Sequence, residues 1–169
     1  MLEKVLINRI MHHIYSNNLM VKSQYGFTPQ TSTVDAMMAL KEFVQESIND
    51  RQYIVVISLD VKGAFNAAWW PGILVSLRNL RCPGNLYKLC VSYFNVRTAF
   101  ITKNNGKEQR KISKGCPQGS ASGPEFCNIQ CDSLLNLRYM KNTKVMAYVD
   151  DLMILVKEQL KKKLTIVPT

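Results

Sequence analysis

The sequence predicts an α+β fold, an antiparallel sheet backed by helices, from three observations. Two strand-length apolar runs, 146–149 and 152–155, flank a pair of aspartates, and two residues between such runs are typical of a hairpin. Asn105-Gly106 separates the runs 98–103 and 107–113, and Asn-Gly is a strong short-range hairpin signal. Near the N-terminus, apolar residues recur with the period of an amphipathic helix.

Helices are expected over residues 2–15, from about 32 to 49, and over 71–80, 86–94 and 124–139. The second opens with a variant capping box, in which Ser32 lies three residues before Asp35. Pro71 suits the first turn of the third helix. The apolar stripe expected on the first helix comprises Leu2, Val5, Leu6, Ile10 and Ile14. The second helix is expected to bury some combination of Val34, Met37, Met38, Leu40 or the aliphatic stem of Lys41, Val44 and Ile48.

A third apolar run, 54–59, has the length of a strand, is expected to be buried, and ends at Asp60. Asp150 and Asp151 are expected at the tip of the C-terminal hairpin, whose body is expected to be buried. If the strand pairs beside that hairpin, three carboxylates meet at one end of a sheet. Such a site suits Mg²⁺, and a pair of ions would clamp the attacking and leaving oxygens of a phosphoryl transfer. The alternative is a solvated turn, since aspartate is a common turn residue.

The 169 residues include 22 Lys and Arg against 12 Asp and Glu, so the net charge is +10. This excess favours a polyanionic partner, nucleic acid first, although a generally basic soluble protein would share it. Hydrophobic residues make up 47%, enough for a core. No stretch is long and apolar enough to span a bilayer, and the N-terminus has no signal-peptide pattern. The five cysteines are odd in number and lack zinc-site spacing, which favours reduced packing residues in an intracellular protein.

The stretch 114–124 is rich in glycine and proline and precedes an expected helix. Its glycines let the backbone approach a ligand closely, and a loop that opens a helix can bind phosphate or position a template nucleotide. A plain connecting loop is the alternative. The expected Asn105-Gly106 hairpin would suit a phosphate backbone or be an ordinary solvated face. It carries the basic residues Arg97, Lys103, Lys107, Arg110, Lys111 and Lys114.

Three stretches stand in fixed order along the chain: Leu59–Phe65, Gly115–Pro124 and Tyr148–Asp151. Together they resemble the palm of a reverse transcriptase from a non-LTR (LINE-like) retrotransposon. Residues 25–36 resemble the segment that precedes the palm strand in that family. The Gly-Cys-Pro-Gln-Gly-Ser sequence at 115–120, together with the Trp-Trp-Pro that follows the first aspartate, resembles the insect-type elements of the group. Each motif alone has modest specificity, but the three together, in this order, are highly specific. The resemblance spans nearly the whole chain.

The resemblance implies RNA-directed DNA polymerase activity, in which a DNA primer is extended on an RNA template with deoxynucleoside triphosphates. Asp60 and Asp150 would hold two Mg²⁺ ions, for which Mn²⁺ could substitute, and Asp151 would assist. Phe65 would exclude a ribose 2′-hydroxyl by its bulk; the alternative is a core phenylalanine. The implied metal ligands are Asp60, the carbonyl of Val61, Asp150 and Asp151. The implied nucleotide contacts are Val61, Lys62, Gly63, Ala64, Phe65 and Gln118, and those to template and primer are Gly119, Ser120 and Tyr148.

The resemblance also implies fingers-side helices over about 1–52, the catalytic palm over about 53–157 and a tail over about 158–169. The basic finger segment, the later palm strands and the thumb are not found, so we expect a partial domain with weak or no activity on its own. Asn66 replaces a residue that is usually acidic, and Thr28 one that is often arginine. Two alternatives are a nucleic-acid-binding remnant without catalysis and an unstable, decayed fragment. The resemblance implies a nuclear location, and the sequence leaves the oligomeric state open.

Overall fold

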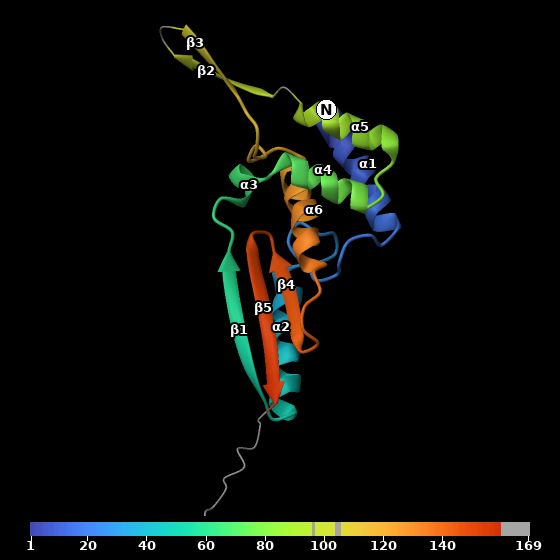
Figure 1. Ribbon diagram of the computed structural model, residues 1–169, viewed down its shortest axis with the longest axis vertical. Coiled ribbons are helices and arrows are strands. Elements are labelled where there is room, and N and C mark those ends of the chain that lie inside the picture. The colour runs from blue at the N-terminus through green and yellow to red at the C-terminus, as the bar shows by residue number, and fades with distance from the viewer. Residues whose placement is uncertain (96, 104–105, 160–169) are drawn as a thin grey trace, which may run out of the picture.

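The computed structural model describes residues 1–95, 97–103 and 106–159. Its elements, in chain order, are α1 (Leu2–Ser16), α2 (Thr33–Asn49), β1 (Gln52–Asp60), α3 (Ala64–Ala67), α4 (Trp70–Asn79), α5 (Gly84–Phe94), β2 (Thr98–Lys103), β3 (Gly106–Lys111), α6 (Gly123–Leu135), β4 (Thr143–Tyr148) and β5 (Asp151–Gln159). In the described residues, three strands form an antiparallel sheet in the order β1-β5-β4, and β2 pairs with β3 (Figure 1). This arrangement confirms the predicted α+β class and the antiparallel pairing.

Four helices, α1, α4, α5 and α6, pack around the largest apolar core, at one end of the molecule (Figure 1). On α1 the predicted Leu6, Ile10 and Ile14 are buried. Leu2 and Val5 are exposed, so the predicted stripe is wrong at its N-terminal end. The buried face of α1 instead includes Ile7 and Met11, which were not predicted.

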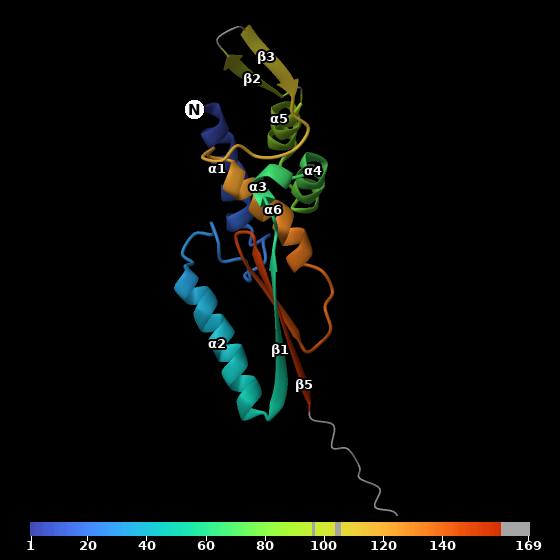
Figure 2. The ribbon, with the colours of Figure 1, turned by 90° about the vertical axis from the view of Figure 1, so that its left-hand side faces the viewer.

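Helix α2 lies along one face of the three-stranded sheet (Figure 2). Its predicted capping box is present: the Ser32 N–H donates to the Asp35 carboxylate at 2.7 Å, and the Asp35 N–H donates to the Ser32 hydroxyl at 3.3 Å. Phe43, with Leu40 beside it, packs on the sheet. The predicted core positions Val34, Met37, Met38 and Ile48 are exposed. The buried stripe instead runs through two alanines, Ala36 and Ala39, whose small side chains let the helix approach the sheet.

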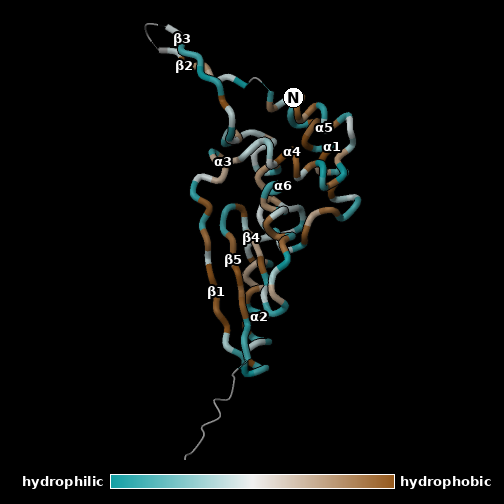
Figure 3. The backbone as a smooth tube through the Cα atoms, viewed as in Figure 1, coloured by the Kyte–Doolittle hydropathy of each residue, from teal (hydrophilic) through white to brown (hydrophobic). Residues whose placement is uncertain are grey.

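Strand β1 is an edge strand, and its apolar side chains are only partly covered. Leu155 of the neighbouring β5 is fully buried, whereas Val55 of β1 is 56% exposed. The prediction that β1 is buried is therefore wrong, although its position in the chain and its final aspartate are as predicted. Figure 3 shows the hydrophobic colour over the middle of β1 and β5. Strand β1 is exposed because α2 covers only one face of the sheet, and on the other face α6 packs mainly against β4 and β5.

The C-terminal hairpin forms as predicted, but its turn is shifted by one residue. Tyr148 pairs with Asp151, so the two connecting residues are Val149 and Asp150, and Asp151 is the first residue of β5. We call Tyr148–Asp151 the aspartate turn. Val149 has a φ of 60°, which supplies the positive φ that a two-residue hairpin needs at its first central position.

Two other predicted boundaries differ: helix α6 ends at Leu135 rather than near residue 139, and α5 begins at Gly84 rather than at residue 86. The short helix α3 was not predicted. The β2–β3 hairpin is present and projects away from the body (Figure 1); its turn residues 104–105 and the basic tail from 160 lie outside the described residues. Among the residues described, no helix is long and apolar enough to cross a membrane.

Candidate active site

The register of the three-stranded sheet brings the predicted acidic residues to one end. Asp60, the last residue of β1, lies directly opposite Asp151, the first residue of β5. The Val61 N–H donates a hydrogen bond to the Asp150 carbonyl at 3.1 Å, which ties the exit of β1 to the aspartate turn. The side chains of Asp60 and Asp151 are exposed, and that of Asp150 is half-buried. All three carboxylates therefore lie at the same sheet end, within reach of solvent.

These carboxylates fit a divalent cation in their chemistry, because Mg²⁺ prefers oxygen ligands and retains water. In the described part of the chain, no three His, Cys, Asp or Glu side chains stand close enough together to hold a metal ion. The exposed side chains of Asp60 and Asp151 can change rotamer rapidly, whereas that of Asp150 is half-buried. The fourth predicted ligand, the Val61 carbonyl, accepts a hydrogen bond from the Ala64 N–H at 3.2 Å, and a carbonyl oxygen keeps a second lone pair.

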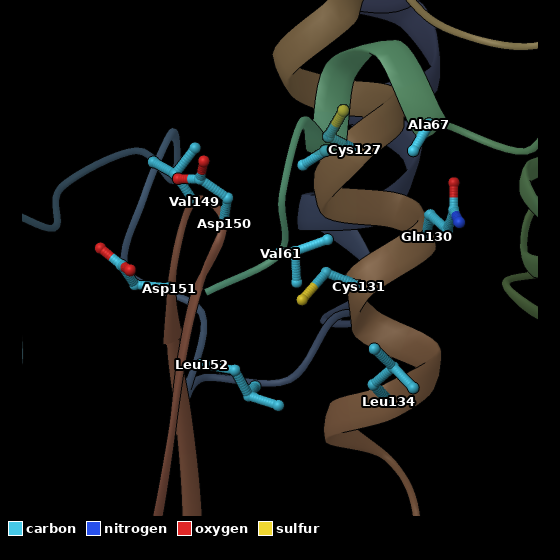
Figure 4. A pocket seen from close by; sticks show the side chains of 11 residues that line it. Val61, Ala67, Cys127, Gln130, Cys131, Leu134, Val149, Asp150, Asp151 and Leu152 are labelled. Carbon is cyan, nitrogen blue, oxygen red and sulfur yellow. The ribbon is translucent and has the colours of Figure 1, made fainter. Parts of the chain in front are cut away.

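A pocket opens beside the aspartate turn, between the loop after β1 and helix α6 (Figure 4). Burial raises the pKa of Cys131. A hydrogen bond with Cys116, and then burial, raises the pKa of Cys127. Among the lining residues, Asp150 and Asp151 supply the carboxylate oxygens that Mg²⁺ prefers. The pocket is lined by Val61, Ala64, Ala67, Cys127, Gln130, Cys131, Leu134, Val149, Asp150, Asp151 and Leu152.

The segment after Asp60 turns sharply into α3. Gly63 has a φ of 64° and caps this helix, a left-handed conformation that glycine adopts at little cost. Lys62 is exposed, whereas Ala64 and Phe65 are half-buried. The Phe65 ring packs edge-on against the Phe27 ring, with 6.4 Å between centroids. Phe65 thus has one side against the helical core and another against the loop that precedes α2.

Residues 114–124, which we call the glycine-proline loop, pack against the segment that follows Asp60. The Gly115 N–H donates to the Ala68 carbonyl and the Cys116 N–H to the Phe65 carbonyl, both at 2.7 Å. A side chain at Gly115 would lie 3.0 Å from the Asn66 carbonyl, and its φ is 90°, so close backbone approach explains this glycine. The first two predicted motifs are therefore joined by hydrogen bonds.

Three predicted template and nucleotide contacts follow on this loop. Gln118 and Gly119 are exposed, and nothing lies within 4 Å of a side chain placed at Gly119. Ser120 is half-buried, and its hydroxyl accepts from the Gly123 N–H at 3.0 Å. The tip of the loop is thus open to a ligand while its base is fixed.

Tyr148, the predicted primer contact, is the last residue of β4 and is half-buried. It lines a second pocket, on the α2 side of the sheet, together with Thr33, Ala36, Met37, Leu40, Met146, Ala147, Asp151 and Met153. Asp151 lines both pockets, so the aspartate turn is accessible from two sides.

A comparison with known protein families gives a match over nearly the full length of the chain. Residues 1–168 match the model of "Reverse transcriptase (RNA-dependent DNA polymerase)". The chain belongs to the reverse transcriptase family.

The relatives of this reverse transcriptase chain include proteins of insect non-LTR retrotransposons. It is 34% identical, over 92% of its length, to the putative 115 kDa protein in the type-1 retrotransposable element R1DM of Drosophila melanogaster. It is 28% identical, over 93% of its length, to the RNA-directed DNA polymerase from the mobile element jockey of Drosophila funebris. The chain spans 14% and 18% of these two proteins.

Solved structures support the reverse transcriptase fold. The chain superposes on telomerase from Candida tropicalis, in complex with a fragment of telomeric RNA, with a TM-score of 0.68 over 91% of its own length and 28% of that chain. Telomerase from Candida albicans gives 0.66 over 91% and 30%. The sequence identities are 13% and 11%, so this similarity concerns the fold alone.

Some residues that shape the candidate site were not singled out from the sequence. Gln24, Gly26 and Asn128 lie behind the aspartate turn, linked by buried hydrogen bonds. Glu3 of α1 accepts hydrogen bonds from Tyr93 and Ser122 at the base of the glycine-proline loop. Their sequence separations exceed 80 positions, so local patterns hold no signal for them. Of these residues, only Gly26 lies in the stretch 25–36, whose resemblance to the family was noted from the sequence.

Proposed function

We propose that this chain carries the catalytic palm and part of the fingers of a retrotransposon reverse transcriptase, and that its reaction is RNA-templated DNA synthesis. The observation that carries the proposal is the pairing of Asp60 with Asp151 across β1 and β5, with Asp150 beside them. Carboxylates gathered at a solvent-accessible sheet end suit two-metal nucleotidyl transfer. We assign about 1–52 to the fingers side, about 53–157 to the palm and about 158–169 to the tail.

Asp60 and Asp150 would hold two Mg²⁺ ions, with Mn²⁺ as a substitute, while Asp151 and the Val61 carbonyl assist. When bound, the ions supply activation of the primer 3′-hydroxyl and neutralisation of the triphosphate charge. The chain's own contribution is to position the ligands: β1 and β5 place Asp60 opposite Asp151, and the hydrogen bond from the Val61 N–H to the Asp150 carbonyl holds the turn that carries Asp150. Since such catalysis depends mainly on positioning, the rigidity of this end of the sheet matters as much as the ligand set.

The incoming deoxynucleotide would lie along Val61, Lys62, Gly63 and Ala64, where Gly63 and Ala64 are small and the Lys62 side chain is exposed. Phe65 would stand under its sugar, because its ring is fixed between the helical core and Phe27. At the tip of the glycine-proline loop, Gln118 would meet the nucleotide, and Gly119 and Ser120 would meet the template. On the other side of the aspartate turn, Tyr148 would support the primer end.

A second candidate is nucleic-acid binding without catalysis, and the basic β2–β3 hairpin favours it. Arg110 and Lys111 are exposed on a strand that projects from the body, and the net charge is +10. Binding through phosphates alone would weaken steeply with salt. It would also be insensitive to neutralisation of Asp150. A location in the nucleus agrees with either candidate.

Single-nucleotide extension of a DNA primer on an RNA template with Mg²⁺ tests the proposal. The wild-type chain is compared with Asp150→Asn and with the control Asp50→Asn. Asp50 follows α2 beside the start of β1, at the opposite end of the strand from Asp60. Incorporation by the wild type and the control, lost in Asp150→Asn, supports the proposal. Salt-sensitive RNA binding by all three proteins, without incorporation by any, selects the second candidate.

A further inference from the structure

A short segment before α2 lies along the edge of β4, next to the aspartate turn. Gln24 forms a parallel bridge with Ala147. The Tyr25 N–H donates to the Ala147 carbonyl, and the Ala147 N–H donates to the Ser23 carbonyl, both at 2.9 Å. The other edge of β4 pairs with β5. The strand is therefore held on both edges up to the residue that precedes Tyr148.

Asn128 of α6 joins this segment to the helix through two buried hydrogen bonds. The Gln24 Nε2 donates to the Asn128 Oδ1 at 2.7 Å, and the Asn128 Nδ2 donates to the Gly26 carbonyl at 2.8 Å. Both side chains are only 1% exposed. Loss of a buried amide hydrogen bond is strongly unfavourable, so the bond from the Asn128 Nδ2 ties the backbone at Gly26 to α6.

Gly26 presses directly on the aspartate turn. A Cβ at this position would lie 2.4 Å from the Val149 amide nitrogen and 2.5 Å from its Cγ2. No side chain fits there, so Gly26 is needed for space. Val149, with its φ of 60°, is a β-branched residue in the left-handed region, a conformation that persists only where the surroundings over-determine it. Gly26 supplies such a constraint from behind, and the Val61 N–H to Asp150 carbonyl hydrogen bond supplies another from β1.

We propose that Asn128 is a positioning residue for Asp150, acting through Gly26 and Val149. Its amide holds the 23–26 segment against the turn, and the segment keeps Val149 in the left-handed conformation that presents the Asp150 carboxylate at the sheet end. The positioning of the turn is a statement about this chain alone. Its consequence for metal binding rests on the function proposed above.

The test uses Asn128→Leu, which removes both hydrogen bonds, and the control Ile129→Val. Ile129 is the next residue of α6, is fully buried, and packs into the helical core rather than behind the turn. Amide hydrogen exchange is measured at Val61, whose N–H donates to the Asp150 carbonyl of the turn, and at Leu155 in the centre of β5. The ratio of the two rates separates local release of the turn from general destabilisation. If Asn128→Leu loses its cooperative melt, Asn128→Asp replaces it, because this change removes only the hydrogen bond that the Asn128 Nδ2 donates to the Gly26 carbonyl.

Asn128→Leu should raise the Val61 exchange rate about tenfold relative to Leu155, as expected for losing buried hydrogen bonds, while Ile129→Val changes both rates alike. Adding Val149→Gly to Asn128→Leu should restore most of the protection, because glycine adopts a positive φ without strain. An unchanged Val61-to-Leu155 ratio in Asn128→Leu, or no rescue by Val149→Gly, overturns the positioning role.

Mn²⁺ alone then links the turn to the proposed function. The wild type should bind Mn²⁺ several-fold more tightly than Asn128→Leu, as measured by electron paramagnetic resonance. If the exchange ratio changes as expected and the wild-type chain binds no Mn²⁺, the proposed function fails and the positioning role stands. If the wild type and Asn128→Leu bind Mn²⁺ equally, the inference that Asn128 positions a metal-binding carboxylate is overturned.

Discussion

Replacing Glu3 with glutamine should loosen α1 from the base of the glycine-proline loop. One carboxylate oxygen, Oε1, accepts from the Ser122 hydroxyl at 2.5 Å, the Ser122 N–H at 3.2 Å and the Tyr93 hydroxyl at 3.1 Å. A hydrogen bond to a charged group contributes about 1.5–3 kcal/mol and a neutral one about 0.5–1.5. Glu3 is partly exposed, so the lower end applies and Glu3→Gln should lose about 1 kcal/mol. For a chain of this size that lowers Tm by about 2–4 °C.

The stability that Glu3 contributes should depend on pH. Burial opposes ionisation of Glu3, but hydrogen bonds from Ser122 and Tyr93 outweigh it and lower its pKa below the ordinary 4.5. A carboxylate with a lowered folded pKa contributes stability above its unfolded pKa and loses it as the pH falls through the folded value. The Tm difference between wild type and Glu3→Gln should therefore be present at pH 7 and shrink as the pH falls below 4.5.

Scanning calorimetry at a series of pH values measures this difference. The control is Glu46→Gln, the same change at an exposed position of α2, which should leave Tm unchanged within about 1 °C. Equal Tm values for wild type and Glu3→Gln at pH 7 would refute the reasoning. So would a difference that widens on acidification.

Three further predictions concern other parts of the chain. Phe65→Ala should relax discrimination between deoxynucleotides and ribonucleotides by about 10–200-fold, measured as the ratio of single-nucleotide incorporation efficiencies; an unchanged ratio would make Phe65 a core residue only. Trp70→Ala should cost about 3–5 kcal/mol in urea denaturation, because the Trp70 ring is buried, stacks on Phe94 and donates to the Gly115 carbonyl at 2.9 Å; a cost below about 1 kcal/mol would contradict this. Replacing Arg110 and Lys111 with alanine should reduce the salt slope of RNA binding by about 0.7–0.9 per lost phosphate contact; an unchanged slope would place the nucleic acid elsewhere.

The strands that carry the aspartates were predictable because their signals are local. An apolar run that ends in a carboxylate, as at Asp60, defines a strand and its terminus without knowledge of the rest of the fold. The same holds for the capping box at Ser32, whose two hydrogen bonds span three residues. That β1 pairs with β5, however, was only a condition in the sequence argument, and the register Asp60–Asp151 settles it.

The position of the aspartate turn was missed by one residue for a physical reason. A two-residue hairpin usually marks its positive-φ position with glycine or asparagine, and here that position is Val149, a residue that avoids it. Local propensity therefore points away from the observed turn. The tertiary contacts from Gly26 and Val61 override it.

The buried face of α2 was mispredicted because hydrophobicity alone does not decide which face packs. Met37 and Met38 are more apolar than the alanines beside them, yet they are exposed. The helix presents Ala36 and Ala39 to the sheet, with Phe43 as its one large buried side chain. Close approach and shape complementarity determine this choice, and both depend on the partner surface.

Paramagnetic broadening by Mn²⁺ is the most direct test of the central claim that the three aspartates form a divalent-metal site. Substoichiometric Mn²⁺ is added to the isotopically labelled chain, and amide signals are compared with those of Asp60→Asn. The account predicts broadening centred on Val61, Asp150 and Asp151, and its loss in Asp60→Asn. Broadening spread over other acidic positions, or unchanged in Asp60→Asn, would contradict it.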